Sequence, residues 1–158
     1  MADITLLKKE TLLAMIEGSL GTKMFRHLYA IVGGEERDLL QDGQLSCAFY
    51  VSKMLVMNDL LPSSHATLAG LERTLEASSE WQKTEELTPG CLVVWEPWEL
   101  GENGPHGHVG FYIGGEEVVS HKDDACAPTK HHYTYGVKDD GSPKRKIVAI
   151  YTHPILSN

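Results

Sequence analysis

The chain has 158 residues, of which 42% are hydrophobic and 23% are charged, proportions typical of one globular domain. Its formal net charge of −8 argues against a nucleic-acid partner, because such proteins normally carry a basic surface. The one dense basic run, residues 144–146, is expected to be a solvated turn. No apolar run is long enough to span a membrane.

The first residues lack a basic segment followed by an apolar stretch. This predicts no export signal, and therefore a cytoplasmic protein, unless a signal has been removed. No pattern in the residues indicates an oligomeric state.

Helical periodicity dominates the first half of the chain. Four helices are expected, over residues 6–17, 23–32, 47–58 and 65–77. Ser46 is predicted to be the N-cap of the third helix, and Ser63-Ser64 that of the fourth. In the third helix Ala48, Val51, Met54 and Leu55 form one apolar stripe that should face the core.

The pattern changes after Pro89-Gly90, where apolar runs and alternation take over. Strands are expected over residues 91–95, 107–113, 116–121, 131–135 and 147–151. Loops are expected over 96–105 and 122–130. Because helices precede strands, the sequence predicts a single α+β domain over 1–158, with helices packed on an antiparallel sheet.

Two of these strands predict a hairpin with a histidine on each arm. If Gly114-Gly115 is a two-residue turn, His108 pairs with His121, with Cβ atoms about 4.5–5.5 Å apart on one face. Gly110 on that face leaves space for a helix end or a substrate. If the loop is one residue longer, His121 leaves this face, and Asp123 or Asp124 becomes the next candidate partner of His108.

Cys47 is the candidate nucleophile among three cysteines, which are too few for a disulfide framework. It falls in the first turn of an expected helix, where the dipole and unpaired N–H groups favour a thiolate and hold an oxyanion. We therefore expect a lowered thiol pKa. A nucleophilic cysteine also needs a base and an orienting group, and His108 and His121 supply both.

Four segments resemble one family. Leu45-Ser-Cys-Ala-Phe-Tyr-Val resembles the nucleophile helix of the NlpC-like cysteine peptidases, a papain-fold family of bacterial cell-wall hydrolases. Leu87-Thr-Pro-Gly-Cys-Leu-Val-Val-Trp resembles that family's "PGDLVFF" strand. Gly107-His-Val-Gly-Phe-Tyr-Ile-Gly matches its "GHVGIYIG" strand, and Val118-Val-Ser-His its "xxIHA" strand. The resemblance covers about residues 24–151.

The resemblance implies a papain-like fold and a thiol hydrolase that cleaves an amide or peptide bond through an acyl-enzyme, without a metal or cofactor. It implies a peptide or muropeptide substrate, namely a peptidoglycan stem peptide or a related peptide. Cys47 would be the nucleophile, His108 the base and His121 the orienting residue. The candidate oxyanion and substrate residues are Tyr29, which is similar to a family tyrosine, Ser46, Trp95 and Trp98.

Three alternatives stay open at this stage. A CHAP-type amidase or an acyltransferase on a non-wall substrate would use the same chemistry. A zinc site would draw on His106, His108, His121, Cys126, His131 and His132. A catalytically silent binding domain would keep the fold without the reaction.

Overall fold

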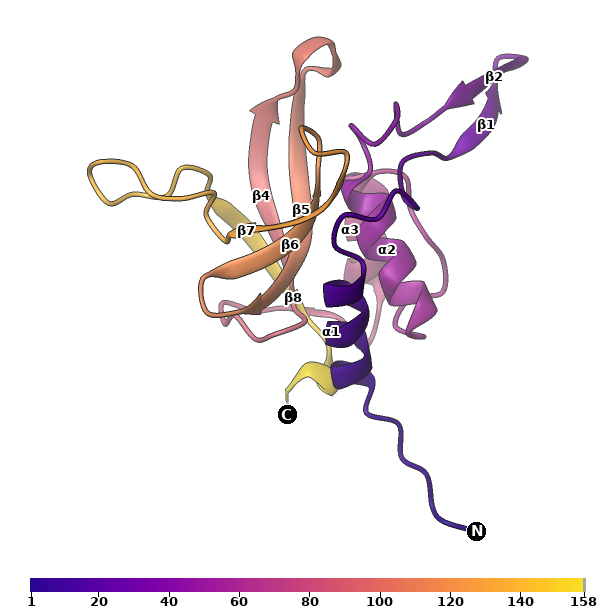
Figure 1. The fold of residues 1–158 in the computed structure, drawn as a ribbon, viewed down its shortest axis with the longest axis vertical. Helices are drawn as coiled ribbons and strands as arrows, with labels where there is room; N and C mark the ends of the chain where they lie inside the picture. The colour runs from indigo at the N-terminus through magenta and orange to yellow at the C-terminus, as the bar shows by residue number, and fades with distance from the viewer. Residues whose placement is uncertain (158) are drawn as a thin grey trace.

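The computed structural model describes residues 1–157. In this range three α-helices lie beside a six-stranded antiparallel sheet, and a small two-stranded hairpin projects from the helical side (Figure 1). The expected α+β class is confirmed. Among the described residues, none of the helices combines the length and apolar character needed to cross a membrane.

Three of the four expected helices are present. They are α1 (Lys8–Gly18), α2 (Cys47–Met57) and α3 (Leu68–Ala77). The third begins later than expected because Thr67, not Ser63-Ser64, is its N-cap and accepts a hydrogen bond from the Gly70 amide.

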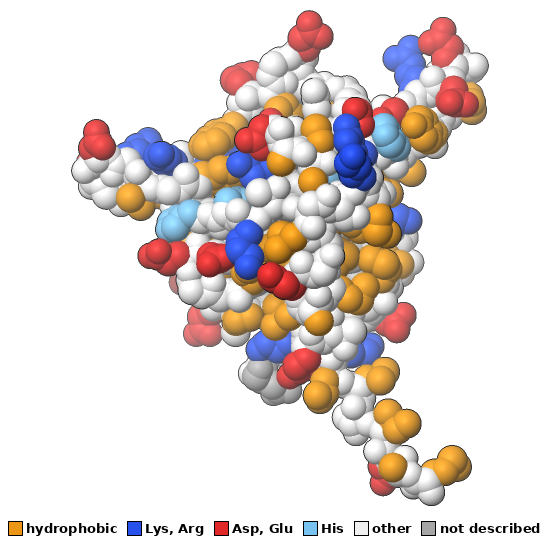
Figure 2. Space-filling model, in the orientation of Figure 1, with side chains coloured by type: hydrophobic (Ala, Val, Ile, Leu, Met, Phe, Trp, Pro, Cys, Tyr) orange, Lys and Arg blue, Asp and Glu red, His pale blue; other side chains and the backbone are white. Residues whose placement is uncertain are grey.

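The prediction of a helix over residues 23–32 is wrong. Instead β1 (Tyr29–Val32) and β2 (Glu35–Asp38) form a hairpin around Gly33-Gly34, whose φ angles of 60° and 86° suit a tight turn. The Asp38 carboxylate accepts hydrogen bonds from three backbone amides and anchors the base of this hairpin. The hairpin and the extended N-terminal segment both stand out from the body of the molecule (Figure 2).

The large sheet has the strand order β3-β8-β4-β5-β6-β7. Its strands are β3 (Gln82–Lys83), β4 (Leu92–Glu99), β5 (Pro105–Gly114), β6 (Glu117–Lys122), β7 (Ala127–His132) and β8 (Ile147–Thr152). Thus β4 extends into the expected loop 96–105, and β7 occupies part of the expected loop 122–130. Short 3-10 helices follow β4 (Gly101–Asn103) and β8 (Pro154–Leu156).

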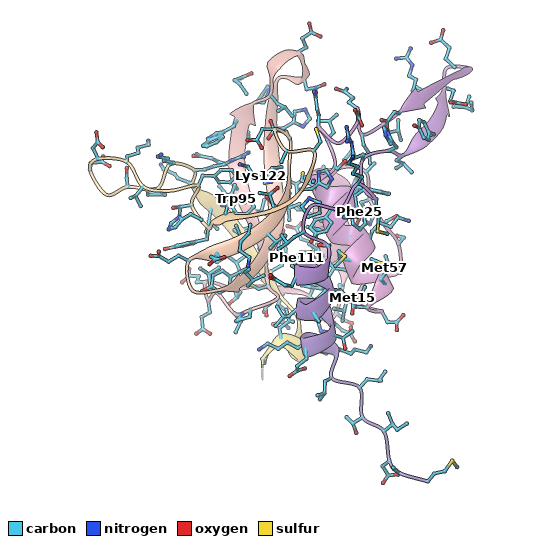
Figure 3. All side chains as sticks on the ribbon, in the orientation of Figure 1. Met15, Phe25, Met57, Trp95, Phe111 and Lys122 are labelled. Atoms are coloured by element: carbon cyan, nitrogen blue, oxygen red, sulfur yellow. The ribbon has the colours of Figure 1, made fainter. Side chains whose placement is uncertain are left out.

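The core lies between α2 and the β5–β6 pair. All four residues of the expected apolar stripe on α2 are buried, as predicted. The Tyr50 ring meets the Phe111 ring of β5 edge to face at 5.9 Å and the Phe25 ring at 5.1 Å, and Figure 3 shows both phenylalanines where sheet and helices meet. This packing holds the N-terminus of α2, which carries Cys47, against β5.

The β5–β6 hairpin differs in register from the prediction. Gly114 pairs with Glu117, so the turn is Gly115-Glu116 rather than Gly114-Gly115. The register then shifts by one residue at Ile113, and Tyr112 pairs with Val118. The Tyr112 hydroxyl donates to the Gly115 carbonyl at 2.7 Å and stabilises this arrangement.

The shift separates the two histidines that were predicted to pair. Because side chains alternate along a strand, a slip of one residue turns His121 to the other face of β6. Ser120 takes its place: a Cβ atom added at Gly110 would lie 2.8 Å from the Ser120 Cβ and 2.7 Å from the Val119 carbonyl oxygen. Gly110 therefore allows a close approach of β6 and does not leave the open space that was expected.

A methyl group at Gly110 should consequently destabilise the hairpin. Gly110→Ala is expected to lower the free energy of unfolding by about 1–3 kcal/mol, because the added carbon meets backbone that cannot move cheaply. Chemical denaturation measures the change. Gly18→Ala at the end of α1 is the control, since nothing lies within 4 Å of its added Cβ. Equal stability of the two variants would contradict the observed register.

Candidate active site

A cavity of about 310 Å³ opens where the N-terminus of α2 meets the first half of β5. Cys47 from α2 and His108 from β5 both line it, together with Trp98, Asp123 and Arg145. The structure thus brings the predicted nucleophile and base to one cavity, although they lie sixty-one positions apart in the sequence.

A chain of hydrogen bonds runs across three neighbouring strands behind this cavity. His108 Nε2 lies 2.9 Å from Ser120 Oγ, and Ser120 Oγ lies 2.7 Å from His131 Nε2. The other ring nitrogen of His131, Nδ1, lies 2.9 Å from the carbonyl oxygen of His132. Ser120 is fully buried and His108 is buried, whereas His131 and His132 are partly buried.

Burial keeps both imidazoles of this chain neutral. It lowers the pKa of His108 well below its usual value, and the positive charge of Arg145 lowers it further. Burial lowers the pKa of His131 to about 4, although the hydrogen bond to the His132 carbonyl opposes the shift. At neutral pH each ring therefore carries one proton.

The direction of each hydrogen bond follows from these charges. A carbonyl only accepts, so His131 carries its single proton on Nδ1 and its Nε2 is an acceptor. Ser120 must then donate to His131, and its oxygen accepts the proton of His108 Nε2. The remaining nitrogen of His108, Nδ1, is unprotonated. His108 thus lines the cavity as a neutral imidazole with one unprotonated nitrogen.

The Cys47 thiol does not have the lowered pKa that its position at the helix start predicted. Burial raises this pKa and outweighs the opposing effects of the Val109 and Ala48 backbone and the Arg145 charge. Among residues 1–157 no hydrogen bond joins the thiol to the His108 ring. Such contacts commonly tighten only when substrate binds. The resting pair is a neutral thiol and a neutral imidazole.

Ser46 occupies the predicted N-cap position of α2 but does not cap the helix with its side chain. Its φ and ψ of −94° and 0° are not those of the usual extended cap. The side chain is fully buried, and its hydroxyl has no partner in the described part of the chain. It is not among the residues that line the cavity.

His121 does not orient His108. Its ring lies on the helix-facing side of the sheet, 6.2 Å from the ring of Tyr50, and both ring nitrogens are buried without a hydrogen bond in the described chain. Burial and the charge of Arg26 lower its pKa to about 4, and the Gly43 backbone opposes the shift only in part. Ser120, not His121, is the hydrogen-bond partner of His108.

The two aspartates that the longer-loop alternative proposed do not take this role. Asp123 lines the cavity, but Nε2 of His108 is engaged by Ser120. Asp124 pairs instead with Lys122, at 3.4 Å. The hydrogen-bond partner of His108 is thus Ser120, which is bonded in turn to His131, and the sequence did not predict this combination.

The three aromatic candidates have different positions. Tyr29 is 63% exposed on the projecting hairpin, where it stacks on His27 away from the cavity. Trp95 is fully buried, donates from Nε1 to the Tyr133 carbonyl at 2.7 Å, and packs 5.5 Å from the His108 ring. Trp98 lines the cavity. Of these three residues, only Trp98 contributes to the wall of the cavity.

Sequence reasoning missed Arg145 as well as Ser120 and His131. It assigned the run 144–146 to a solvated turn, whereas Arg145 is only 6% exposed and lines the cavity. Because lysines flank this residue on both sides, the local sequence gives no indication that its side chain is buried. His131 was noted only as a zinc candidate, and among the described residues no group of three potential ligands comes together around a metal-sized space.

Comparison with known proteins adds no relative from which a function can be carried over: no protein-family model matches the chain, and no curated protein matches it. A functional proposal must therefore stand on the geometry of the site.

The burial of His121 predicts a pH dependence of stability. Its pKa is about 6.5 in the unfolded chain and about 4 when folded, so the unfolded state binds a proton first as the pH falls. Stability should fall by up to about 1.4 kcal/mol per pH unit from this residue between pH 6.5 and 4. In His121→Phe the free energy of unfolding should fall less steeply with decreasing pH, because the uptake of one proton on unfolding is lost. Denaturation at pH 7 and pH 5 measures this difference.

The same variant separates the two roles of this histidine. His121→Phe should leave the reactivity of Cys47 unchanged at pH 7. Lost reactivity in a protein of unchanged stability would restore the orienting role that the sequence predicted.

Proposed function

We propose that this protein is a thiol hydrolase in which Cys47 attacks an amide carbonyl and His108 Nδ1 accepts the thiol proton. The observation that carries the proposal is the shared cavity of Cys47 and His108, combined with a hydrogen-bond chain that leaves Nδ1 unprotonated. A thiol and a free base that share one cavity are the minimum that nucleophilic catalysis requires.

The reaction proceeds by general-base catalysis, because the thiol is neutral at rest. The thiol proton moves to His108 Nδ1 as the sulfur–carbon bond forms and the carbonyl π electrons move to oxygen. The first amides of α2 face this oxyanion. His108 then gives its proton to the amine as the carbon–nitrogen bond breaks. Water, deprotonated by His108, attacks the thioester, and the sulfur leaves and is reprotonated.

The resemblance to the NlpC-like peptidases supports a papain-like fold and a peptide substrate such as a peptidoglycan stem peptide. The helix that carries Cys47 packs on the antiparallel strand that carries His108, in the order that the resemblance implies. In this proposal Ser120 and His131 together replace the single orienting histidine. A CHAP-type amidase or an acyltransferase would use the same two central residues, so the products decide between them.

Muropeptide digestion tests the reaction. Incubation with a muropeptide mixture should release new amine termini that mass spectrometry detects, and Cys47→Ala should abolish the release. His108→Ala should lower the rate by roughly 10²–10⁴-fold, the usual contribution of a general base. Cys126→Ala is the matched control, because this cysteine does not line the cavity. Equal product release by wild type and Cys47→Ala would refute the thiol mechanism.

Removal of the Ser120 hydroxyl tests the orienting chain. Ser120→Ala leaves His108 Nε2 without its partner, so the proton is free to occupy Nδ1 and block the base. We expect kcat to fall by roughly 10- to 1,000-fold with little change in KM, less than the ~10⁴-fold loss when the acidic member of a triad is replaced. The pH profile of kcat should also shift, which a purely structural role would not cause.

Thr129→Ala provides the control for this experiment, because Thr129 pairs with Ser120 across the β6–β7 ladder but its hydroxyl donates to the Ala127 carbonyl of its own strand. An unchanged kcat and pH profile in Ser120→Ala would show that the chain does not orient His108.

A further inference from the structure

Arg145 places a buried positive charge at the wall of the cavity that holds Cys47. Its side chain is covered almost completely, and it lines the cavity just before β8 begins. Its charge acts on both Cys47 and His108, lowering the pKa of each. The chain as a whole has a net charge of −8, whereas this buried side chain is positive.

Neutral groups hold the guanidinium in one orientation. Nε donates to the Glu96 carbonyl at 2.9 Å and Nη2 to the His106 carbonyl at 3.0 Å. The guanidinium lies 4.5 Å from the centre of the Trp98 ring and 5.3 Å from that of Tyr135. The group is therefore rigid, and its fixed fork matches the geometry of a carboxylate.

No carboxylate of the described chain pairs with this cation. Asp123 lines the same cavity and its charge acts on Arg145, but no ion pair forms between them within 4.0 Å. The nearby Lys122 already pairs with Asp124. A buried charge without a counter-ion is costly, and a bound anion offsets that cost.

We propose that Arg145 binds a carboxylate of the substrate, carried close to the carbonyl that Cys47 attacks. The inference rests on the proposed function and names its substrate class: amides or peptides with an acidic group beside the scissile bond. Trp98 and Tyr135 would exclude water from the pair, which strengthens the interaction.

Two thiol reagents of nearly equal size test the proposal. Iodoacetate and iodoacetamide both form a sulfur–carbon bond to Cys47 as iodide leaves with the electron pair and the thiol proton passes to His108 or water. They differ in one carboxylate. Mass spectrometry of the Cys47 peptide at pH 8.5 gives the two rates, and glutathione gives the reference ratio for a free thiol.

We expect the iodoacetate-to-iodoacetamide ratio at Cys47 to exceed that of glutathione by roughly ten- to a hundredfold, the usual worth of a charge-assisted hydrogen bond. Arg145→Gln should return the ratio to the reference, and Arg145→Lys should give an intermediate value. Lys146→Gln removes an exposed cation from the next position and should leave the ratio unchanged.

Because Arg145 also donates hydrogen bonds to two backbone carbonyls, its variants can lose stability. Asp123→Asn covers that case, since removing the competing carboxylate should raise the ratio above that of wild type. A wild-type ratio equal to that of glutathione overturns the carboxylate site while leaving the nucleophile in place. Failure of both reagents to modify Cys47 overturns the proposed function itself, and the site with it.

Discussion

The candidate site depends on one hydrogen bond, from His131 Nδ1 to the carbonyl of His132. A carbonyl oxygen has no proton to give, so this bond fixes the protonation of His131 and, through Ser120, that of His108. Adjacent strands β5, β6 and β7 each supply one member, which is why the register of the β5–β6 hairpin matters so much. A slip of one residue would turn Ser120 to the other face of β6 and, because β7 pairs with β6, would also move His131 away from His108.

The sequence predicted what depends on local periodicity and missed what depends on register. The apolar stripe of α2 and the position of Cys47 at the start of this helix follow from spacing alone and are observed. The hairpin was predicted as a hairpin, but adjacent glycines allow two positions of the turn, and these present opposite faces of β6. The choice is made by the shift at Ile113 and by the Tyr112 hydroxyl, which local alternation does not encode.

Burial is the second quantity that the sequence did not reveal. The helix start favours a Cys47 thiolate, yet the loss of water around the sulfur is the larger effect. Arg145 shows the same limit, because its flanking lysines suggested a solvated turn while its own side chain folds inward over Trp98. In both cases the residue type and position were visible, and the surroundings that set its chemistry were not.

The carboxylate proposed at Arg145 would also act on the base. The charge of Arg145 is one of the causes that lower the pKa of His108, so a base in the empty cavity is weaker than one beside a neutralised guanidinium. A substrate carboxylate would cancel much of that field and raise the affinity of Nδ1 for the thiol proton. Binding and proton transfer would then be coupled through one side chain. An uncharged substrate of the same shape would fill the cavity but leave His108 a poor base, so discrimination would appear in kcat as well as in KM.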